Sequence, residues 1–468
     1  MIKQLSSFID LKIWIIKNLK YILILTIAFK FLFAFLYGTQ DVEWWKAWYS
    51  SIEEKGVLNV YGVTDNENIK LLKQGLSFEE VRKKTQNVIK YEAYMYERKN
   101  YVVTQPPVYL YHIFLAGKIY KIIDPNLTNN RLYNFFLNLF PIIYSILTCF
   151  LIHYFLNSTQ YKEHALVSAL FCSLNPLIIL NSPIQGFWDP ILGFYVLSSF
   201  IFLYKRKLTI SFIFFTIAIL VKPTAIIIIP VYLLFIIKEH ASRQILKSIF
   251  ISLVVFLFLV SPFIFSNHFI SMILGVHSIL DSSNDISRQS LNIWWPLQYY
   301  LNFYNSNSHG LTNFIIGKEF IWYEDFSAQK ISSINLKLLS TILFIIATIV
   351  NLYNASKYLL KNRAYIFYFA FIQIYIYFML RIGVQNNHYY MMLVFCSVIC
   401  FFSKEMFRTF LIIILIFFIQ DFIFYGFGRD FSLMLGALNF LNLPFITVIL
   451  SLLNFLFFLK ILLNPIKI

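Results

Sequence analysis

The chain alternates between long apolar runs and short polar breaks over residues 21–462. A helix needs ~20 predominantly apolar residues to cross a bilayer, and runs of that kind recur along the whole chain. A helix also satisfies its own backbone polar groups inside the lipid, where no water can do so. We therefore predict an all-α, multi-pass protein of the lipid bilayer, with about 12 transmembrane helices.

Two polar segments are much longer than the other breaks. The first covers residues 38–105, and its pattern over residues 69–98 predicts one or two amphipathic helices on the membrane surface. The second covers residues 267–335. The apolar run at residues 106–122 leaves two alternatives open, because a full crossing there would invert the topology of everything that follows, whereas partial insertion would not.

Composition and charge set the orientation. The chain is 59% hydrophobic and 13% charged, with a net charge of +16. Its basic residues cluster between apolar runs, as the positive-inside rule describes, and no nucleic-acid motif accompanies them, so we predict no nucleic-acid partner. Residues 1–20 hold four lysines and are predicted to be a cytoplasmic amphipathic N-terminus. Further cytoplasmic breaks are predicted at residues 205–207, 238–247, 357–363 and 404–408.

Unusual polar residues gather at the opposite, outward ends of the apolar runs. They form five groups: Asp41 with Glu43, YVVTQPPVYLYH at 101–112, QGFWD at 185–189, SLNIWW at 290–295 and QNNHYY at 385–390. A transporter would instead carry charged residues in the middle of its spans and often an internal repeat, and neither stands out here. The distribution favours binding or chemistry at the outer membrane boundary.

An acidic pair and a lysine are the clearest candidates for chemistry. Asp41 and Glu43 could provide a general base or hold a metal ion, or they could be a solvated pair that ends the first span. Trp44 and Trp45 beside them are typical of membrane-interface anchors. Lys222 lies within an apolar run, where an ammonium group is costly unless it meets a lipid phosphate or reaches the headgroups.

The order of these groups resembles the GT-C superfamily of membrane glycosyltransferases, which use polyprenyl-phosphate-linked sugars. Within it, the chain is similar to bacterial homologues of the GPI-anchor mannosyltransferases, in register over residues 32–401. The resemblance rests on the acidic pair, QPPVYLY at 105–111, NP at 175–176, IQGFWD at 184–189, KPT at 222–224 and LNIWW at 291–295. The chain departs from the family pattern at 184–189, where the order is loosened, and at Thr224, which replaces a glutamine. It also has Gln385 and Asn386 in place of a histidine–glutamate pair.

The resemblance implies a GT-C-like bundle with a transmembrane catalytic module at residues 21–401 and further transmembrane helices at 402–468. The implied reaction is an inverting transfer of a hexose, mannose favoured, from a polyprenyl-phosphate donor to a hydroxyl acceptor. The acceptor would be a glycan, glycolipid or protein, at the outer face of the cell membrane, the bacterial cytoplasmic membrane by this resemblance.

The same resemblance assigns roles to residues. Asp41 would be the catalytic base, with Glu43 assisting, and Lys222, Arg381 and His388 would bind the donor phosphate. The implied substrate-binding residues are Gln185, Asp189, Asn292, Trp294, Gln385, Asn386 and Tyr389. The resemblance implies no certain cofactor, and a divalent cation, Mg²⁺ or Mn²⁺, would bind at Asp41 and Glu43 if one is used.

Two other functions stay open. A lipid-linked glycan polymerase or ligase works on similar substrates and depends on a large late external loop. Here residues 267–335 carry His268, His277, Arg288 and His309. A transporter or flippase for a lipid-linked sugar would need charged residues within its spans.

Overall fold

The protein is almost entirely helical in the part that the computed structural model describes. This part comprises residues 21–22, 24–90, 100–281, 286–287, 290–306, 336–424 and 443–468. Its strands are β1 (Ile89–Lys90) and β2 (Asn100–Tyr101), which pair antiparallel. The prediction of an all-α protein is confirmed.

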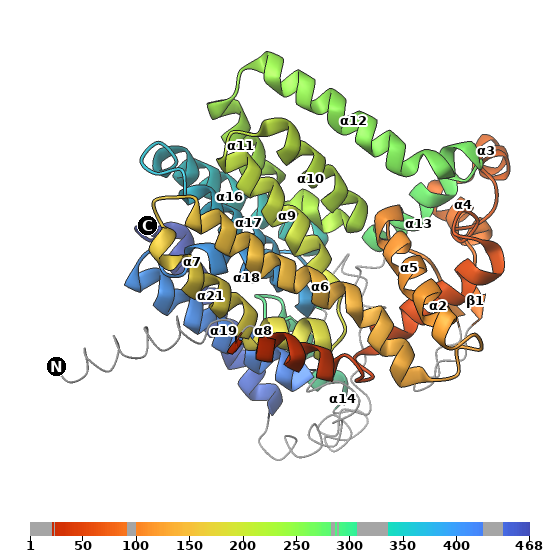
Figure 1. Ribbon diagram of the computed structural model, residues 1–468, viewed down its shortest axis with the longest axis horizontal. Coiled ribbons are helices and arrows are strands. Elements are labelled where there is room, and N and C mark those ends of the chain that lie inside the picture. Colours follow the sequence, from red (N-terminus) through yellow and green to blue (C-terminus); the bar gives the residue numbers. More distant parts are fainter. Residues whose placement is uncertain are drawn as a thin grey trace.

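The helices follow one another with short connections (Figure 1). The first is Ile24–Phe33. In the first half it is followed by α2 (Gln40–Lys55), α3 (Asp65–Lys73), α4 (Phe78–Thr85), α5 (Pro107–Ile123), α6 (Asn130–Asn157), η1 (Lys162–His164), α7 (Ala165–Leu174), α8 (Pro176–Ile179), the π-helical η2 (Leu180–Ile184), α9 (Asp189–Tyr204), α10 (Leu208–Val221), η3 (Pro223–Ile228) and α11 (Ile229–Glu239). The second half contains α12 (Ser242–Phe265), α13 (Phe269–Asp281), α14 (Trp295–Ser306), α16 (Leu336–Tyr358), α17 (Tyr365–Leu380), η4 (Asn386–Tyr389), α18 (Tyr390–Ile399), α19 (Lys404–Phe424) and α21 (Leu443–Leu463).

Within the described residues, five helices are long and apolar enough to cross a membrane, namely α6, α12, α16, α19 and α21. A sixth span results if the two helical stretches Lys162–Leu174 and Pro176–Ile184, bent by 46° at a short break, are taken together. Five further apolar helices have only 10–17 residues. A multi-pass membrane protein is therefore supported, and the number of about 12 spans stays a prediction.

The core of the bundle surrounds α17. Every side chain of this helix is buried except that of Tyr377, because α17 is apolar on all sides and packs against neighbours all round. The outer helix α12 lies along one edge of the bundle (Figure 1) and exposes large apolar side chains such as Phe250 and Phe258. An apolar surface of this kind on a long helix is typical of contact with lipid.

One apolar run divides where the sequence suggested continuity. Residues 208–237 form two short helical stretches, α10 and then η3 with α11, and they are separated at Lys222 and Pro223. Lys222 has extended backbone dihedrals, because the residue before a proline is disfavoured in the helical region. Lys222 thus lies at the turn of a hairpin and not within one continuous helix.

The two long polar segments contact each other. Asp65, at the start of α3, accepts hydrogen bonds from the backbone N–H groups of Phe269 at 2.9 Å and Ile270 at 2.8 Å. A carboxylate at a helix N-terminus is stabilised by the unpaired N–H groups and by the helix dipole, so Asp65 caps α13. These contacts place parts of residues 38–105 and 267–335 on the same side, as the charge pattern predicts.

Helix α5 packs lengthwise beside α2. The rings of Trp48 and Tyr109 lie 6.1 Å apart near one end, and Glu53 pairs with Lys118 and Lys121 near the other. Between them, Gly117 lets the Tyr49 ring lie directly against the α5 backbone. Helix α2 belongs to the polar segment 38–105, which is predicted to lie outside the membrane. Because α5 contacts α2 along this length, partial insertion of α5 is favoured over a full crossing.

Candidate active site

The segment that leads into α2 docks on the third polar group. The backbone N–H of Thr39 donates to the carbonyl of Gln185 at 2.9 Å, and the Thr39 hydroxyl donates to the same oxygen at 3.1 Å. Gly38 has a φ of 67°, and a side chain there would meet the Gln185 carbonyl at 2.8 Å. Only glycine allows so close an approach. This contact therefore fixes the position of the start of α2, which carries Asp41 in its first turn.

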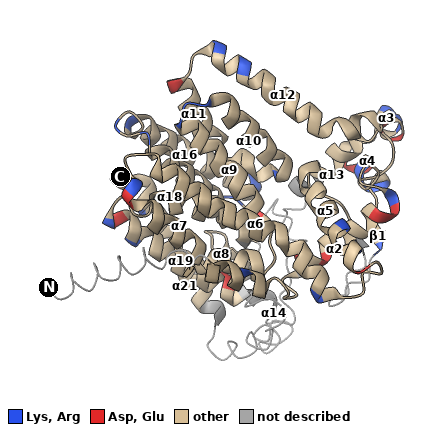
Figure 2. Ribbon diagram, in the orientation of Figure 1, with Lys and Arg blue, Asp and Glu red and all other residues tan. Residues whose placement is uncertain are grey.

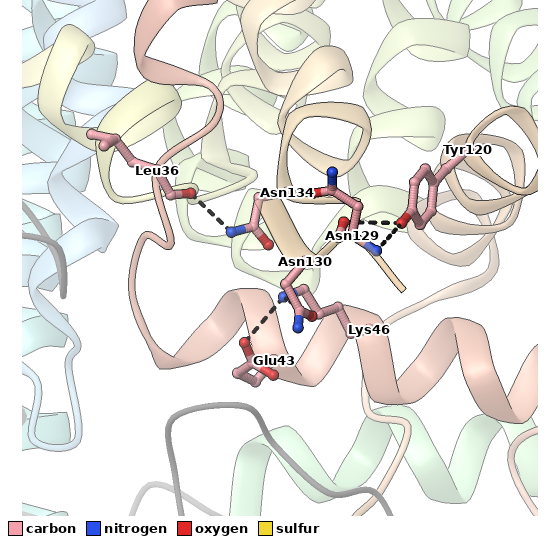
Figure 3. Close-up of polar contacts among 7 residues, drawn as sticks. All are labelled: Leu36, Glu43, Lys46, Tyr120, Asn129, Asn130 and Asn134. Carbon is pink, nitrogen blue, oxygen red and sulfur yellow. Dashed lines mark hydrogen bonds and ion pairs between the residues drawn. The ribbon is translucent and has the colours of Figure 1, made fainter. Parts of the chain in front are cut away.

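The two predicted catalytic carboxylates point in different directions. Side chains two residues apart on a helix lie on nearly opposite faces, and Asp41 and Glu43 do so on α2. Glu43 is fully buried and forms an ion pair with Lys46 at 3.2 Å, and Lys46 also donates to Asn130 of α6 at 3.4 Å (Figure 3). Asp41 is only partly buried.

The predicted phosphate-binding lysine meets a predicted sugar-binding aspartate. Lys222 Nζ lies 2.7 Å from Oδ1 of Asp189, at the start of α9, and Nδ2 of Asn387 donates to Oδ2 of Asp189 at 3.0 Å. The Asp189 side chain is 4% exposed and the Lys222 side chain 14%. Both carboxylate oxygens of Asp189 are therefore engaged, and Lys222 is the more exposed side chain of the two.

An aromatic cluster joins these charged groups. Tyr109 stacks on Trp188 with ring centroids 4.9 Å apart, and Trp45 lies 5.4 Å from Trp188. The Tyr109 hydroxyl is within electrostatic range of both Asp41 and Asp189. The structure thus brings together the first three polar groups and Lys222. Trp45 is 3% exposed, so the expectation that it is an interface anchor is wrong.

Several buried amides near this cluster make no hydrogen bond within the described part of the chain. Both side-chain atoms of Gln185 and of Asn181, one π-helical turn earlier, lack a partner and are fully buried. The same holds for Oδ1 of Asn138, which lies against Gly186, and for the indole nitrogen of Trp188. Buried polar groups are normally satisfied, and unsatisfied ones mark places where water or a ligand binds.

The fourth polar group is used for structure. Oδ1 of Asn292 accepts from the backbone N–H of Trp294 at 3.1 Å, and its Nδ2 donates to the carbonyl of Arg381 at 3.4 Å. The Trp294 indole donates to the carbonyl of Leu380 at 2.9 Å, and its ring is buried. These bonds hold residues 290–295 against the end of α17.

Arg381 and the residues of the fifth polar group, 385–390, lie in different surroundings and have different partners. Arg381 donates to the hydroxyl of Thr341, and His388 Nδ1 lies 3.4 Å from the Tyr377 hydroxyl. Gln385 caps η4, and the side chain of Asn386 lies outside the described residues. The buried Tyr389 hydroxyl donates to the carboxylate of Asp421 on α19.

Four residues of interest were missed from the sequence: Asn181, Asn387, Asp421 and Lys30. Asn387 was visible within QNNHYY, but the family pattern drew attention to its neighbours. Lys30 and Asp421 lie within apolar runs and are fully buried, with Lys30 donating to the Ser145 hydroxyl at 3.1 Å. The expectation that no charged residue stands within a span is therefore wrong.

The site does not assemble an obvious metal centre. Among the described residues, no group of three or more His, Cys, Asp or Glu side chains is placed to hold a metal ion. Asp41 and Glu43 face different surroundings, and the Glu43–Lys46 pair supplies a positive charge where a cation would bind. This arrangement does not fit one cation shared by Asp41 and Glu43.

Comparison with known proteins identifies the class. Residues 106–265, about a third of the chain, match the family described as dolichyl-phosphate-mannose-protein mannosyltransferase. No curated protein matches the chain. The matched residues include Tyr109, Gln185, Asp189 and Lys222 of the site. The match supports the resemblance, drawn from the sequence, to the GT-C superfamily of membrane glycosyltransferases. As a class, these enzymes depend on a polyprenyl-phosphate-linked sugar.

Proposed function

We propose that the protein transfers a hexose, with mannose favoured, from a polyprenyl-phosphate donor to a hydroxyl group at the outer face of the cell membrane. The acceptor is a glycan, a glycolipid or a protein. The observation that carries this proposal is the aromatic cluster of Trp45, Tyr109 and Trp188, which brings α2 with Asp41 beside the ion pair of Asp189 and Lys222. The preference for mannose rests on the description of the matched family.

The chemistry needs a base for the acceptor. In the proposed step, the acceptor oxygen forms a bond to the anomeric carbon while the bond from that carbon to the phosphate oxygen breaks. The polyprenyl phosphate leaves with the electron pair, and Asp41 takes the hydroxyl proton. A single displacement of this kind inverts the configuration. We assign the base to Asp41 alone, because Glu43 is buried in its ion pair with Lys46.

The leaving phosphate needs positive charge. Lys222 is the candidate nearest to the carboxylates, and an ammonium group held in a site of low dielectric stabilises the developing negative charge strongly. Arg381 and His388 would assist from the connection between α17 and η4. For the sugar, the amide of Gln185, which makes no hydrogen bond within the described part of the chain, offers a donor and an acceptor.

Two rivals are weighed against particular observations. For a polymerase or ligase, His268 bonds to the carbonyl of Ser266 and His277 packs against Phe78, while Arg288 and His309 lie outside the described residues. For a transporter, Lys30 and Asp421 are buried charges within helices, but each has a hydrogen-bond partner in a neighbouring helix. Neither rival accounts for the group around Asp41.

A transfer assay with purified protein tests the proposal. The protein is incubated with a panel of polyprenyl-phosphate sugars and a membrane-glycan acceptor extract, and release of polyprenyl phosphate is followed. We expect one donor to be consumed, and D41N to reduce its turnover at least about a hundredfold, as loss of a general base does. A parallel sample with EDTA tests whether Mg²⁺ or Mn²⁺ bound at Asp41 takes part.

The outcomes separate the alternatives. Consumption of no donor by the wild-type protein would contradict the glycosyltransferase proposal, and movement of intact donor across vesicle membranes would then favour a transporter. Full activity of D41N would leave the enzyme class standing but remove Asp41 as the base. Growth of the product by many sugars in one reaction would favour a polymerase.

A further inference from the structure

We infer that Asp189 is a resident counter-ion that competes with the donor phosphate for Lys222, and so promotes release of the polyprenyl-phosphate product. The inference rests on the proposed function. It differs from the role that the family resemblance implies for Asp189, which is to orient a sugar hydroxyl.

The first support is the way in which the Asp189 carboxylate is used. Its Oδ1 lies 2.7 Å from Lys222 Nζ, and its Oδ2 accepts from Asn387 at 3.0 Å. With one strong partner on each oxygen and only 4% of its side chain exposed, the carboxylate has little surface left for a sugar hydroxyl. Its main interaction is with the lysine.

The second support is the difference in exposure across the pair. The Lys222 side chain is 14% exposed, against 4% for Asp189. Lys222 is therefore the more exposed side chain of the pair, and a phosphate that approaches it competes with Asp189. Lys222 also lies at the hairpin between α10 and η3, where it follows a helix end and precedes a proline, so its side chain is not confined within a helix.

The third support is electrostatic. A buried ammonium group without a counter-ion is strongly destabilised, and any anion that reaches it binds tightly. When the donor is absent, Asp189 removes that penalty. A phosphate that binds Lys222 therefore gains only the difference in free energy between its own ion pair with Lys222 and the ion pair of Asp189 with Lys222. Binding of the product is weaker as a result, and release is faster. Asn387 contributes by stabilising the Asp189 carboxylate when Lys222 turns toward the phosphate.

The test measures binding of sugar-free polyprenyl phosphate to purified protein, together with transfer kinetics. For D189N we expect polyprenyl phosphate to bind about tenfold more tightly, because the lysine has lost its competing charge. Turnover and KM for the donor should both fall, since product release becomes limiting. For N387A we expect the opposite sign, weaker binding of polyprenyl phosphate, because Asp189 then depends more on Lys222.

A double variant shows whether Asp189 acts through Lys222. In K222M, the further change D189N should leave the affinity for polyprenyl phosphate unchanged, because coupled residues are not additive. The exposed pair of Glu79 and Lys83 on α4 supplies the control, and E79Q with K83M should change neither quantity.

Each result bears on the inference. A sugar-orienting Asp189 predicts that D189N raises KM for the donor and leaves binding of sugar-free polyprenyl phosphate unchanged, which would overturn the inference. A merely structural Asp189 predicts loss of activity without tighter binding, which would also overturn it. If the wild-type protein consumes no donor at all, the proposed function fails instead, and that outcome is distinguishable from both.

Discussion

Two acidic residues one position apart have different tasks in this protein. Asp41 lies partly exposed in the first turn of α2 and faces the group around Tyr109. Glu43 lies on the other side of the same turn and is fully buried with Lys46, which also bonds to Asn130 (Figure 3). Because the helix separates them by about 200°, one carboxylate is available for chemistry and the other holds α2 on α6.

Removal of Glu43 should therefore act on stability. We expect E43A to lower the free energy of unfolding by about 3–5 kcal/mol, because it leaves the Lys46 ammonium buried without a counter-ion. The double variant E43M/K46M should regain most of this loss, since no charge then remains buried. Unfolding in detergent micelles, followed by circular dichroism, measures both.

The matched comparison is D41N. Asp41 is partly exposed, so D41N should change stability by about 0.5 kcal/mol or less while it removes transfer activity. If E43M/K46M instead keeps the stability of the wild type but has activity as low as that of D41N, Glu43 would share the catalytic task and its assignment as a structural residue would be wrong.

At the scale of elements, α2 is fixed to α5 by a charged contact. Glu53 near the end of α2 lies 2.6 Å from Lys118 and also pairs with Lys121, both on α5. Hydrogen bonds from these two ammonium groups lower the pKa of Glu53 from 4.5 to about 2. Because α2 carries Asp41 and α5 carries Tyr109, this contact helps to hold two sides of the site together.

The pKa of Glu53 makes a pH-dependent prediction. A carboxyl group whose pKa is lowered by folding contributes stability that is present above its unfolded pKa and is lost as the pH falls through its folded pKa. The wild-type protein should thus exceed E53Q by roughly 1 kcal/mol at pH 7, after allowance for solvent screening. Between pH 4.5 and about 2 the difference should vanish, which denaturation in detergent at several pH values measures.

An exposed pair of the same kind provides the control. Glu79 and Lys83 lie 2.6 Å apart on α4 with more than half of each side chain exposed, so E79Q should change stability by no measurable amount. A difference between wild type and E53Q that is as large at pH 2 as at pH 7 would show that Glu53 acts through packing and not through its charge.

The polar groups illustrate what a sequence can predict about these elements. That Asp41, Gln185 and Asp189 lie on one side follows from the alternation of apolar runs and basic breaks. That Asn292 is used for hydrogen bonds to Trp294 and to the carbonyl of Arg381 does not follow from this alternation. Whether a polar side chain is free for a ligand depends on tertiary contacts that a single chain does not reveal.

Other residues of the site were missed from the sequence for the same reason. Asn387 differs from its neighbours only in that it reaches Asp189, 198 positions earlier in the chain. The break at Lys222 was readable in principle, because Pro223 disfavours a continuous helix and the breaks at 205–207 and 238–247 are both predicted to be cytoplasmic. Local rules therefore predicted the helices well, and the pairing of side chains across them less well.

At the scale of the whole molecule, the contacts between polar breaks fall into two sets, one on each predicted face of the membrane. On the face predicted to be cytoplasmic, Glu239 pairs with Arg363 at 3.0 Å and with Arg206 at 3.5 Å, which joins three of the basic breaks. On the other face, Asp65 caps α13 and Asp189 meets Asn387. Figure 2 shows the charged residues at the ends of the molecule, with mostly uncharged helices between them. Breaks predicted to be cytoplasmic thus contact one another, and breaks predicted to face outward contact one another.

This arrangement predicts the position of the turn between α5 and α6. If α5 does not cross the membrane, the exposed Asn126 faces outward, together with Gln74, and Lys207 faces the cytoplasm. We expect a membrane-impermeant maleimide added to intact cells to label N126C and Q74C, and to label K207C only after permeabilisation. The four native cysteines are buried, so they should add little background.

The test is decisive because one additional membrane crossing reverses the side of every later segment. A full crossing by α5 would place Asn126 in the cytoplasm and would also turn Lys207 outward, because every later segment changes side with it. Labelling of K207C in intact cells together with protection of N126C would then contradict both the position of α5 and the outward site. It would place Asp189 and Lys222 on the opposite side from Asp41, although Thr39 beside Asp41 bonds directly to Gln185. The reversed pattern is therefore incompatible with the contacts on which the proposed site is built.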